Sequence, residues 1–418
     1  MNVITLPEQG CDWDSLKQRM QVLQRGDWSH RDGRLPLHCY FAGEEVGKVA
    51  AEAYSMFASA NALAPQAFPS CGQMEREVVA MVLDLLHRPD GGAGSMTSGG
   101  TESIILAVKA ARDHARAMRH AHRPNIVIPE SAHPAFDKAA QLLGLDVRRV
   151  PVADDYRCDV AAMEAALDDE TVLLVASAPS LPYGLIDRIE AMAALALRKR
   201  VWLHVDSCIG GMLAPFVQQL GYPVPAFDFR LPGVRSMSVD LHKFGYAAKG
   251  ASLILYRDAA DQQFQFSRFN RWPKGDYFTP TLAGTRSGGA IASAWAVMRF
   301  LGREGYLHIS RQVMQLRDRY LAGLAALPSV QLLGTPELSV VTFTTRSPSH
   351  VFALADGMRS RGWYMSLVAS PPAIQQTVNL VHAALADQYF DDLRAVLHDV
   401  LARGTEAPAD RQQLVVTY

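Results

Sequence analysis

The sequence has few cysteines and no regular cysteine spacing. Its five cysteines, among 418 residues, are an odd number and include no CxxC pair. A disulfide framework needs paired cysteines, so this usage favours a reducing compartment. The chain also lacks a basic start followed by a long apolar run, and it lacks a stretch free of charge and proline that is long enough to span a membrane. We therefore expect a cytoplasmic protein with no membrane-spanning segment, although export by a route without an obvious signal is left open.

The sequence has no excess of either charge. Its formal net charge is −1, and charged residues make up 20% of the chain. A strongly basic surface is what nucleic acids and anionic membranes attract, so we expect neither partner. Aromatic and basic residues do mix in the segment 264–274. Such a mixture can bind nucleic acid, but packing near a dimer contact is the better interpretation.

Several catalytic motifs are missing. The histidines form no HExxH motif and no pair with metal-ligand spacing, which argues against a metal site. The segment 177–183 contains no GxSxG nucleophile elbow, which argues against a hydrolase. The glycine-rich segment 91–103 contains neither a GxGxxG fingerprint nor the Gly-Lys-Ser/Thr of a Walker loop.

Strand-like and helix-like segments alternate through most of the chain. Amphipathic helix patterns separate short apolar runs, and residues 171–176 form a continuous run of this kind. Such runs are typical of parallel strands buried on both faces, so the alternation predicts an α/β domain with a mostly parallel sheet. From about Ser310 the pattern changes to that of a smaller α+β domain. We predict an N-terminal arm over residues 1–60, a large domain over residues 61–309 and a small domain over residues 310–418.

A lysine and an aspartate each follow a predicted buried strand. Lys243 comes shortly after the apolar run that ends at Val239, and Asp206 ends the segment VWLHVD. Pyridoxal phosphate chemistry uses both groups. A lysine amine forms a Schiff base with the cofactor aldehyde, and a carboxylate keeps the pyridine nitrogen protonated so that the ring can accept electrons. The pair therefore predicts an enzyme that uses pyridoxal 5'-phosphate.

The glycine-rich segment 91–103 opens a predicted helix. Free backbone N–H groups and the helix dipole attract a phosphate at such a point. Gly100 and Thr101 are therefore candidate ligands of the cofactor phosphate. Most glycine-rich turns before helices are simply capped turns, and the argument for a phosphate site here depends on Lys243 and Asp206.

Four other side chains are candidates for binding or proton transfer. His133 follows a predicted strand and can stack on the pyridine ring and move protons, or it can be a capping or partly buried histidine. His242 can contact the phosphate or form a structural hydrogen bond. Lys249 and the glycine-flanked Arg286 suit anion binding. A solvated lysine and an ordinary loop salt bridge are the alternatives for these two.

Motifs between residues 38 and 382 together resemble those of the sphingosine-1-phosphate lyases, within the fold type I, group II decarboxylase-like pyridoxal phosphate enzymes. The HVD segment and the His-Lys pair are shared with amino-acid decarboxylases and indicate the superfamily. The segment around Lys249, residues 228–230 and the loop at 285–286 indicate the lyase branch. The matching segments are TSGGTES at 97–103, HVD at 204–206, FDFR at 227–230, GV at 233–234, GYA at 245–247, KG at 249–250, PT at 280–281, AG at 283–284 and GW at 362–363.

The resemblance implies a fold and a set of cofactor contacts. The fold is the fold type I of pyridoxal phosphate-dependent transferases, with a large, mostly parallel sheet domain and a smaller C-terminal α+β domain. Lys243 would hold the cofactor as a Schiff base, Asp206 would pair with the ring nitrogen, and His133 would stack on the ring. The cofactor phosphate would be held by Gly100, Thr101 and His242, together with Thr285 of the partner subunit in a homodimer.

The resemblance also implies a substrate and a reaction. Tyr40, Lys249 and Arg286 would bind the phosphate of a phosphorylated long-chain base such as sphingosine 1-phosphate, and Tyr183 would lie near the substrate. The expected activity is that of an aldehyde-lyase, which breaks the Cα–Cβ bond and releases a fatty aldehyde and phosphoethanolamine. His133, Lys249 and Tyr183 are candidates for the base that takes the proton of the hydroxyl group.

Two alternatives remain open at this point. An amino-acid decarboxylase could use the same scaffold, but it would not need a clamp for a second phosphate. A non-catalytic homologue could bind the cofactor or a lipid phosphate. The chain departs from the lyase pattern at four places, where Ala64 replaces a histidine, Ser207 an alanine, Leu241 a threonine and Ser287 a proline. The change at Ala64 affects the expected clamp for the substrate phosphate.

Overall fold

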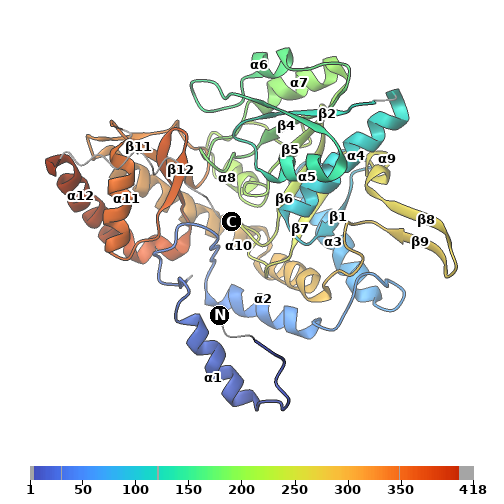
Figure 1. Ribbon diagram of the computed structural model, residues 1–418, viewed down its shortest axis with the longest axis horizontal. Helices are drawn as coiled ribbons and strands as arrows, with labels where there is room; N and C mark the ends of the chain where they lie inside the picture. Colours follow the sequence, from blue (N-terminus) through green and yellow to red (C-terminus); the bar gives the residue numbers. More distant parts are fainter. Residues whose placement is uncertain (1–3, 30, 120–121, 348, 404–418) are drawn as a thin grey trace.

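A seven-stranded sheet forms the centre of the large domain in the computed structural model, which describes residues 4–29, 31–119, 122–347 and 349–403 (Figure 1). The strand order is β1-β7-β6-β5-β4-β2-β3. Strand β7 runs antiparallel to both of its neighbours, and the pairs from β6 to β3 are parallel. This confirms the predicted large, mostly parallel sheet. The strands are β1 (Ala93–Thr97), β2 (Asn125–Pro129), β3 (Asp146–Val150), β4 (Thr171–Ser177), β5 (Trp202–Asp206), β6 (Val234–Asp240) and β7 (Ser252–Tyr256).

Helices cover both faces of this sheet because its central strands are apolar on both sides. In β4, Leu174 packs into the hydrophobic core on one face, and Leu173 and Val175 pack into the core on the other. Helices α4 and α5 lie on the second face, and α3, α6, α7 and α8 contribute to the first. Their bounds are α3 (Pro69–Leu85), α4 (Gly100–Arg119), α5 (Ala135–Leu143), α6 (Val160–Ala165), α7 (Ile189–Lys199) and α8 (Ala214–Gln219), with a short α9 (Ala259–Gln262) and η1 (Gln263–Gln265) near the edge.

A long helix, α10 (Gly288–Ala325), leads from the large domain into the small one. It bends at Gly302, whose φ of +56° is non-helical. The periodicity predicted only its second half, and the predicted boundary between residues 309 and 310 falls inside it, so the domain limits stay predictions. Residues 404–418 of the predicted small domain lie outside the described part of the chain.

The small domain contains an antiparallel sheet in the order β10-β11-β13-β12. Its strands are β10 (Val330–Leu332), β11 (Val340–Thr345), β12 (Ser366–Ala369) and β13 (Pro372–Thr377), and its helices are α11 (His350–Ser360), η2 (Leu380–Leu385) and α12 (Ala386–Arg403).

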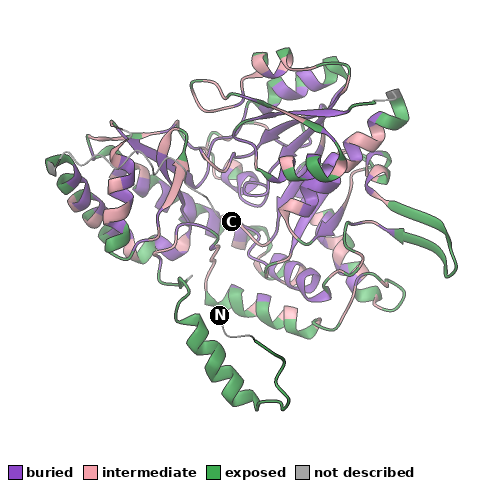
Figure 2. Cartoon of the chain, in the orientation of Figure 1, coloured by how far each residue is buried: buried purple, intermediate pink, exposed green. Residues whose placement is uncertain are grey.

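Two segments project from the body of the chain. Helix α1 (Trp13–Gln24) contains no buried residue, whereas α2 (Glu44–Met56) packs on α10. The hairpin β8 (Ser267–Trp272) and β9 (Gly275–Thr279) is exposed along nearly its whole length, as Figure 2 shows. The aromatic residues of this hairpin gave no strand signal, because they lack a buried face.

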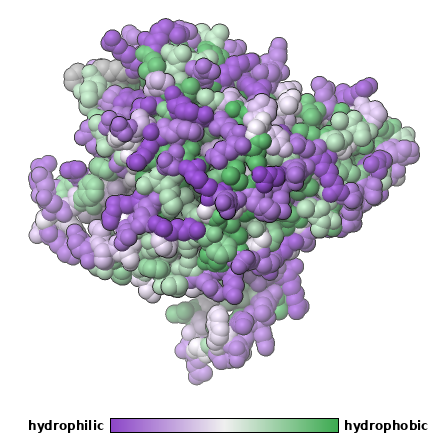
Figure 3. Space-filling model, turned by 180° about the vertical axis from the view of Figure 1, so that it is seen from behind, coloured by the Kyte–Doolittle hydropathy of each residue, from purple (hydrophilic) through white to green (hydrophobic). Residues whose placement is uncertain are grey.

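The surface is largely polar on the face opposite to that of Figure 1. Figure 3 shows hydrophilic side chains over much of this face, with hydrophobic ones gathered in smaller areas between them. Within the described ranges, every helix is too short or too polar to cross a membrane.

Candidate active site

The candidate site lies where the parallel strands of the large sheet end. Strand β5 ends at Asp206, β6 ends at Asp240, and Lys243 follows three residues later. Helix α4 begins at Gly100, directly after β1, which runs in the same direction as β6. Open α/β sheets bind ligands at this carboxyl edge. A cavity of about 410 Å³ opens here, and the predicted residues among its lining are Tyr40, Gly100, Thr101, His133, Asp206, His242 and Lys243.

Lys243 is paired with an aspartate that the sequence analysis did not single out. Its Nζ lies 2.9 Å from Oδ2 of the buried Asp240, whose other oxygen accepts a hydrogen bond from the Ser252 hydroxyl. Burial alone would lower the pKa of Lys243, but the attraction of Asp240 outweighs it and raises the pKa. Burial would raise the pKa of Asp240, but Lys243 and His242 reverse this effect and lower it. The lysine is therefore held as an ammonium in the absence of a cofactor.

A chain of hydrogen bonds leads from the core to the Asp206 carboxylate. Trp202 Nε1 donates to Ser236 Oγ at 2.8 Å, and Ser236 Oγ lies 2.8 Å from His204 Nδ1. His204 Nε2 lies 3.3 Å from Ser238 Oγ, which donates to Asp206 Oδ1 at 3.0 Å. Burial lowers the pKa of His204 to about 4, so this ring is neutral and its one N–H points toward Ser238. All donors in the chain then point toward Asp206, which stabilises its anionic form.

His133 and His242 have defined tautomers in the site. The backbone N–H of Ala135 donates to His133 Nδ1 at 3.1 Å, so the neutral ring carries its proton on Nε2. His242 Nδ1 donates to the Ala251 carbonyl at 2.8 Å, and its Nε2 lies 3.7 Å from Asp240. Burial lowers the pKa of both rings. Both histidines are therefore neutral at pH 7.

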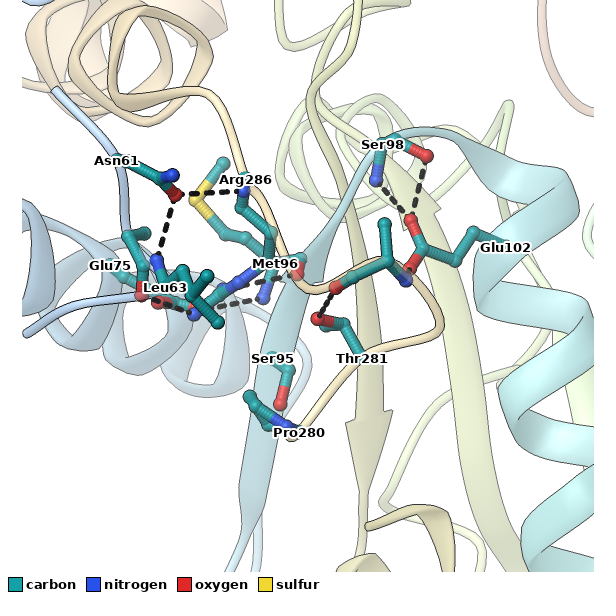
Figure 4. Close-up of polar contacts among 12 residues, drawn as sticks. Asn61, Leu63, Glu75, Ser95, Met96, Ser98, Glu102, Pro280, Thr281 and Arg286 are labelled. Carbon is teal, nitrogen blue, oxygen red and sulfur yellow. Dashed lines mark hydrogen bonds and ion pairs between the residues drawn. The ribbon is translucent and has the colours of Figure 1, made fainter. Parts of the chain in front are cut away.

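The start of α4 is shaped to admit a ligand close to its backbone. A Cβ on Gly100 would lie 2.8 Å from Cys208 Sγ and 3.0 Å from Asp240 Oδ1. The Glu102 carboxylate accepts hydrogen bonds from both the N–H and the hydroxyl of Ser98, and its other oxygen accepts from the N–H groups of Leu282 and Ala283 (Figure 4). Glu102 thus joins the loop before α10 to the glycine-rich turn.

Lys249 and Tyr40 lie side by side at the edge of the cavity. The Lys249 ammonium lies 5.3 Å from the centre of the Tyr40 ring and donates to the carbonyls of His242 and His38 at 3.1 and 3.4 Å. Desolvation, helped by the charge of Lys243, lowers the pKa of Lys249. Burial raises the pKa of Tyr40 to about 12. The two side chains together offer an ammonium and a phenol O–H to an anion.

Thr285 and Arg286 line a neighbouring cavity of about 560 Å³ together with Lys249. The Thr285 hydroxyl accepts a hydrogen bond from Asn61 at 3.3 Å. The guanidinium of Arg286 forms an ion pair with Glu75 (Figure 4), and its side chain is mostly buried. An arginine whose charge is already paired is a weaker anion ligand than the sequence predicted. The roles of Thr285 and Arg286 stay predictions.

Tyr183 is not among the residues that line the cofactor cavity. Its hydroxyl donates to the Ser370 carbonyl at 2.8 Å, and its ring packs on Tyr156 in a small separate core. Burial raises the pKa of Tyr183 to about 12. Its position does not favour the expected role near the substrate.

The residues of the cavity fit pyridoxal phosphate. Its lining carries the amine of Lys243 and the carboxylate of Asp206, which accepts a hydrogen bond from Ser238. The first turn of α4, with Gly100 and Thr101 on the lining, offers backbone N–H groups to a phosphate. The volume of about 410 Å³ lies in the range of cofactor pockets.

Sequence reasoning missed Asp240, the chain behind Asp206, and His38. Asp240 could have been found, because it ends the same apolar run that precedes Lys243. The alternation of Ser236 and Ser238 in β6 placed two hydroxyls on one side, but no local signal linked them to His204. His38 lies in an irregular segment without a motif, and it is recognised only by its position at the cavity.

Comparisons with known proteins agree over most of the chain. The family described as the pyridoxal-dependent decarboxylase conserved domain matches residues 8–346. The chain is 42% identical over 371 residues to a sphingosine-1-phosphate lyase of Oryza sativa subsp. japonica, covering 87% of this chain and 69% of that protein. It is 37% identical to that of Dictyostelium discoideum, covering 97% and 76%. The solved structure of the sphingosine-1-phosphate lyase of Burkholderia pseudomallei is similar with a TM-score of 0.91 at 39% identity, covering 96% of this chain and 95% of that one.

Proposed function

We propose a function for this chain from its family: it belongs to the pyridoxal-dependent decarboxylase family and is a homologue of the sphingosine-1-phosphate lyases. The protein is a pyridoxal phosphate-dependent aldehyde-lyase. It cleaves the Cα–Cβ bond of phosphorylated long-chain bases, of which sphingosine 1-phosphate is the type, and it releases a fatty aldehyde and phosphoethanolamine. Its partner in this reaction is a small lipid phosphate.

The observation that carries this proposal is the shared cavity of Lys243 and Asp206. Pyridoxal phosphate, when bound, supplies an aldehyde for amine exchange and a protonated ring that accepts the electrons of the broken bond. Lys243 holds the aldehyde end, and the Asp206 carboxylate holds a proton at the ring nitrogen. His133 stacks on the ring, and Gly100, Thr101 and His242 bind the cofactor phosphate.

Two side chains at the edge of the cavity support a phosphorylated substrate. The phenol of Tyr40 and the ammonium of Lys249 lie side by side at the edge of the cavity. The positive charge of Lys243 is close enough to Lys249 to lower its pKa. A dianionic phosphate monoester would relieve the repulsion between these two cations. An amino-acid decarboxylase on this scaffold would not need such a pair, which is why we favour the lyase.

The proposal is tested by incubating the purified protein with pyridoxal phosphate and sphingosine 1-phosphate and measuring fatty aldehyde and carbon dioxide. The protein should release aldehyde from the lipid and no carbon dioxide from amino acids. The Lys243→Ala variant should lose both the turnover and the absorbance band of the Schiff base. Release of carbon dioxide without aldehyde would favour the decarboxylase, and borohydride trapping of the lysine without any product would favour a binding protein.

We also infer a homodimer in the cytoplasm. The exposed apolar residues of α1 and of the β8-β9 hairpin are surfaces that a second copy of the chain would cover, and Thr285 would then reach the cofactor phosphate of the partner subunit. The five free cysteines, four of them buried, suit a reducing compartment.

A further inference from the structure

The structure assigns to His38 the role of the base that takes the proton of the substrate hydroxyl, an inference that rests on the proposed function. His38 lines the cofactor cavity, and it also lines an adjoining cavity of about 580 Å³ at the boundary with the small domain. It therefore stands where a substrate that extends from the cofactor toward solvent must pass. Four observations lead to this residue.

The backbone conformation of His38 is strained. Its φ of +61° is in the left-handed region, which a non-glycine residue seldom adopts and which is often found at functional sites. The segment around it is fastened to the small domain, because the carbonyls of Arg34, Pro36 and Cys39 accept hydrogen bonds from Tyr364, Thr377 and Asn379 at 2.8 to 3.0 Å. The surrounding contacts thus impose this conformation on His38, which lines both cavities together with His133.

The other two histidines of the cavity are poorly placed to accept a proton. The one lone pair of neutral His133 is on Nδ1, and it already accepts the N–H of Ala135 at 3.1 Å. Neutral His242 uses its N–H on Ala251, and its other nitrogen lies 3.7 Å from Asp240 and is assigned to the cofactor phosphate in the proposed function. His133 can therefore donate a hydrogen bond from Nε2, but it is not set up as a base.

The lysines and the phenol of the site are held in their protonated forms. Lys249 donates to two backbone carbonyls, and Lys243 lies 2.9 Å from the Asp240 carboxylate. Desolvation lowers the pKa of Lys249, but its two hydrogen bonds to carbonyls favour the ammonium form, and the Asp240 carboxylate favours that of Lys243 before the cofactor binds. An ammonium can supply a proton but not take one. Burial raises the pKa of Tyr40 to about 12, so its hydroxyl is also protonated at neutral pH.

The surroundings of His38 keep its imidazole neutral. The charged groups that face it are the ammonium groups of Lys249 and Lys243, and both disfavour a second positive charge nearby. Desolvation, followed by these two charges, lowers the pKa of His38 below its ordinary value of 6.5. A neutral imidazole is the form that accepts a proton, and it is available throughout the neutral range.

Each proton and electron pair of the cleavage step has a donor and an acceptor among the groups of the site. An imidazole nitrogen of His38 takes the proton of the hydroxyl on Cβ, and the O–H electron pair becomes the second bond of the aldehyde carbonyl. Pyridoxal phosphate, when bound, would supply the ring that accepts the electron pair of the broken Cα–Cβ bond. The Lys243 ammonium then returns one proton to Cα, and transfer of the proton from His38 to Lys243 through water restores both groups.

The test compares His38→Asn with His87→Asn. Asparagine tolerates left-handed backbone, and His87 is a matched control because it is a histidine with φ of +54° that pairs with Asp228 outside the cavity. His38→Asn should lower kcat roughly 100-fold or more with a nearly unchanged KM. It should also remove the rise of kcat with pH below 6.5 that we expect of the wild type. His87→Asn should leave both unchanged.

Two measurements do not depend on turnover. Carbethoxylation of His38 in the holoenzyme, followed by mass spectrometry, should titrate with a midpoint below 6.5. A 3-deoxy analogue of sphinganine 1-phosphate, which lacks the hydroxyl, should bind His38→Asn as tightly as the wild type. A variant that keeps its kcat, or that loses affinity for the analogue, overturns the assignment to His38. A wild type that releases no aldehyde overturns the proposed function itself.

Discussion

At the scale of single residues, the site depends on where opposite charges are buried. Lys243 and Asp240 form a pair next to the cofactor cavity, and Asp206 receives the end of a hydrogen-bond chain that starts in the core. The motif around Lys243 was sufficient to predict the cofactor, and the structure places Lys243 and Asp206 on the lining of one cavity. Asp240 could have been found from its place at the end of the apolar run before Lys243. His38 escaped notice because its contacts, such as that with Lys249, come from segments distant in the sequence.

Removal of Asp240 should destabilise the cofactor-free protein. In Asp240→Asn the Lys243 ammonium, whose side chain is 25% exposed, would lose the carboxylate 2.9 Å away. Breaking a largely buried ion pair costs about 3 kcal/mol, which urea unfolding at pH 7 would measure. The control is Asp84→Asn, which breaks an exposed pair with Arg303 and should cost less than about 1 kcal/mol. Equal losses in the two variants would contradict the importance of burial.

At the scale of elements, strand ends and one helix start position the site. Strands β5 and β6 deliver Asp206, Asp240 and Lys243 to one edge of the sheet, and α4 begins at that edge because β1 runs parallel to β6. Most helices and strands were predictable from periodicity to within a few residues. Strand β1 was interpreted as part of a glycine-rich loop, because Gly94 hides its apolar pattern. The glycine is needed there since a Cβ would lie 2.6 Å from Leu255.

Two adjacent glycines should differ in their effect on cofactor affinity. In Gly100→Ala the new methyl group would press on Cys208 and Asp240 at 2.8 and 3.0 Å, and it would displace the first turn of α4 from the phosphate. We expect affinity for pyridoxal phosphate to fall about 10-fold or more, which corresponds to about 1.4 kcal/mol. Gly99→Ala is the control, since its Cβ would have no neighbour within 4 Å. Absorbance titration with pyridoxal phosphate measures the affinity of both variants. An unchanged affinity of the Gly100→Ala variant would contradict the close fit at Gly100.

At the scale of the whole molecule, the exposed segments indicate an incomplete surface. Helix α1 has no buried residue, and its Trp13 and Leu23 side chains are 64% and 70% exposed. Phe269 and Trp272 of the β8-β9 hairpin are about half exposed. Exposed apolar residues grouped in this way are typical of surfaces that a partner covers.

The protein should sediment as a dimer. A chain of 45.8 kDa would then give twice this mass in sedimentation equilibrium at micromolar concentration. Replacement of Phe269 and Trp272 by serine should shift the equilibrium toward the monomer and weaken cofactor binding, because Thr285 of the partner subunit would be lost. Replacement of Phe300, an exposed aromatic residue of α10, by serine is the control. A wild type that remains monomeric would contradict the proposed homodimer.

Local patterns in the chain were enough to predict the α/β class and the cofactor, because strand periodicity and short motifs depend on neighbours close in the sequence. The geometry of proton transfer was not predictable in this way. It depends on which carbonyl each histidine and lysine meets, and those partners come from segments that packing alone brings together. The position of His38 is the clearest case, since residues of the large domain and of the small domain both hold it in place.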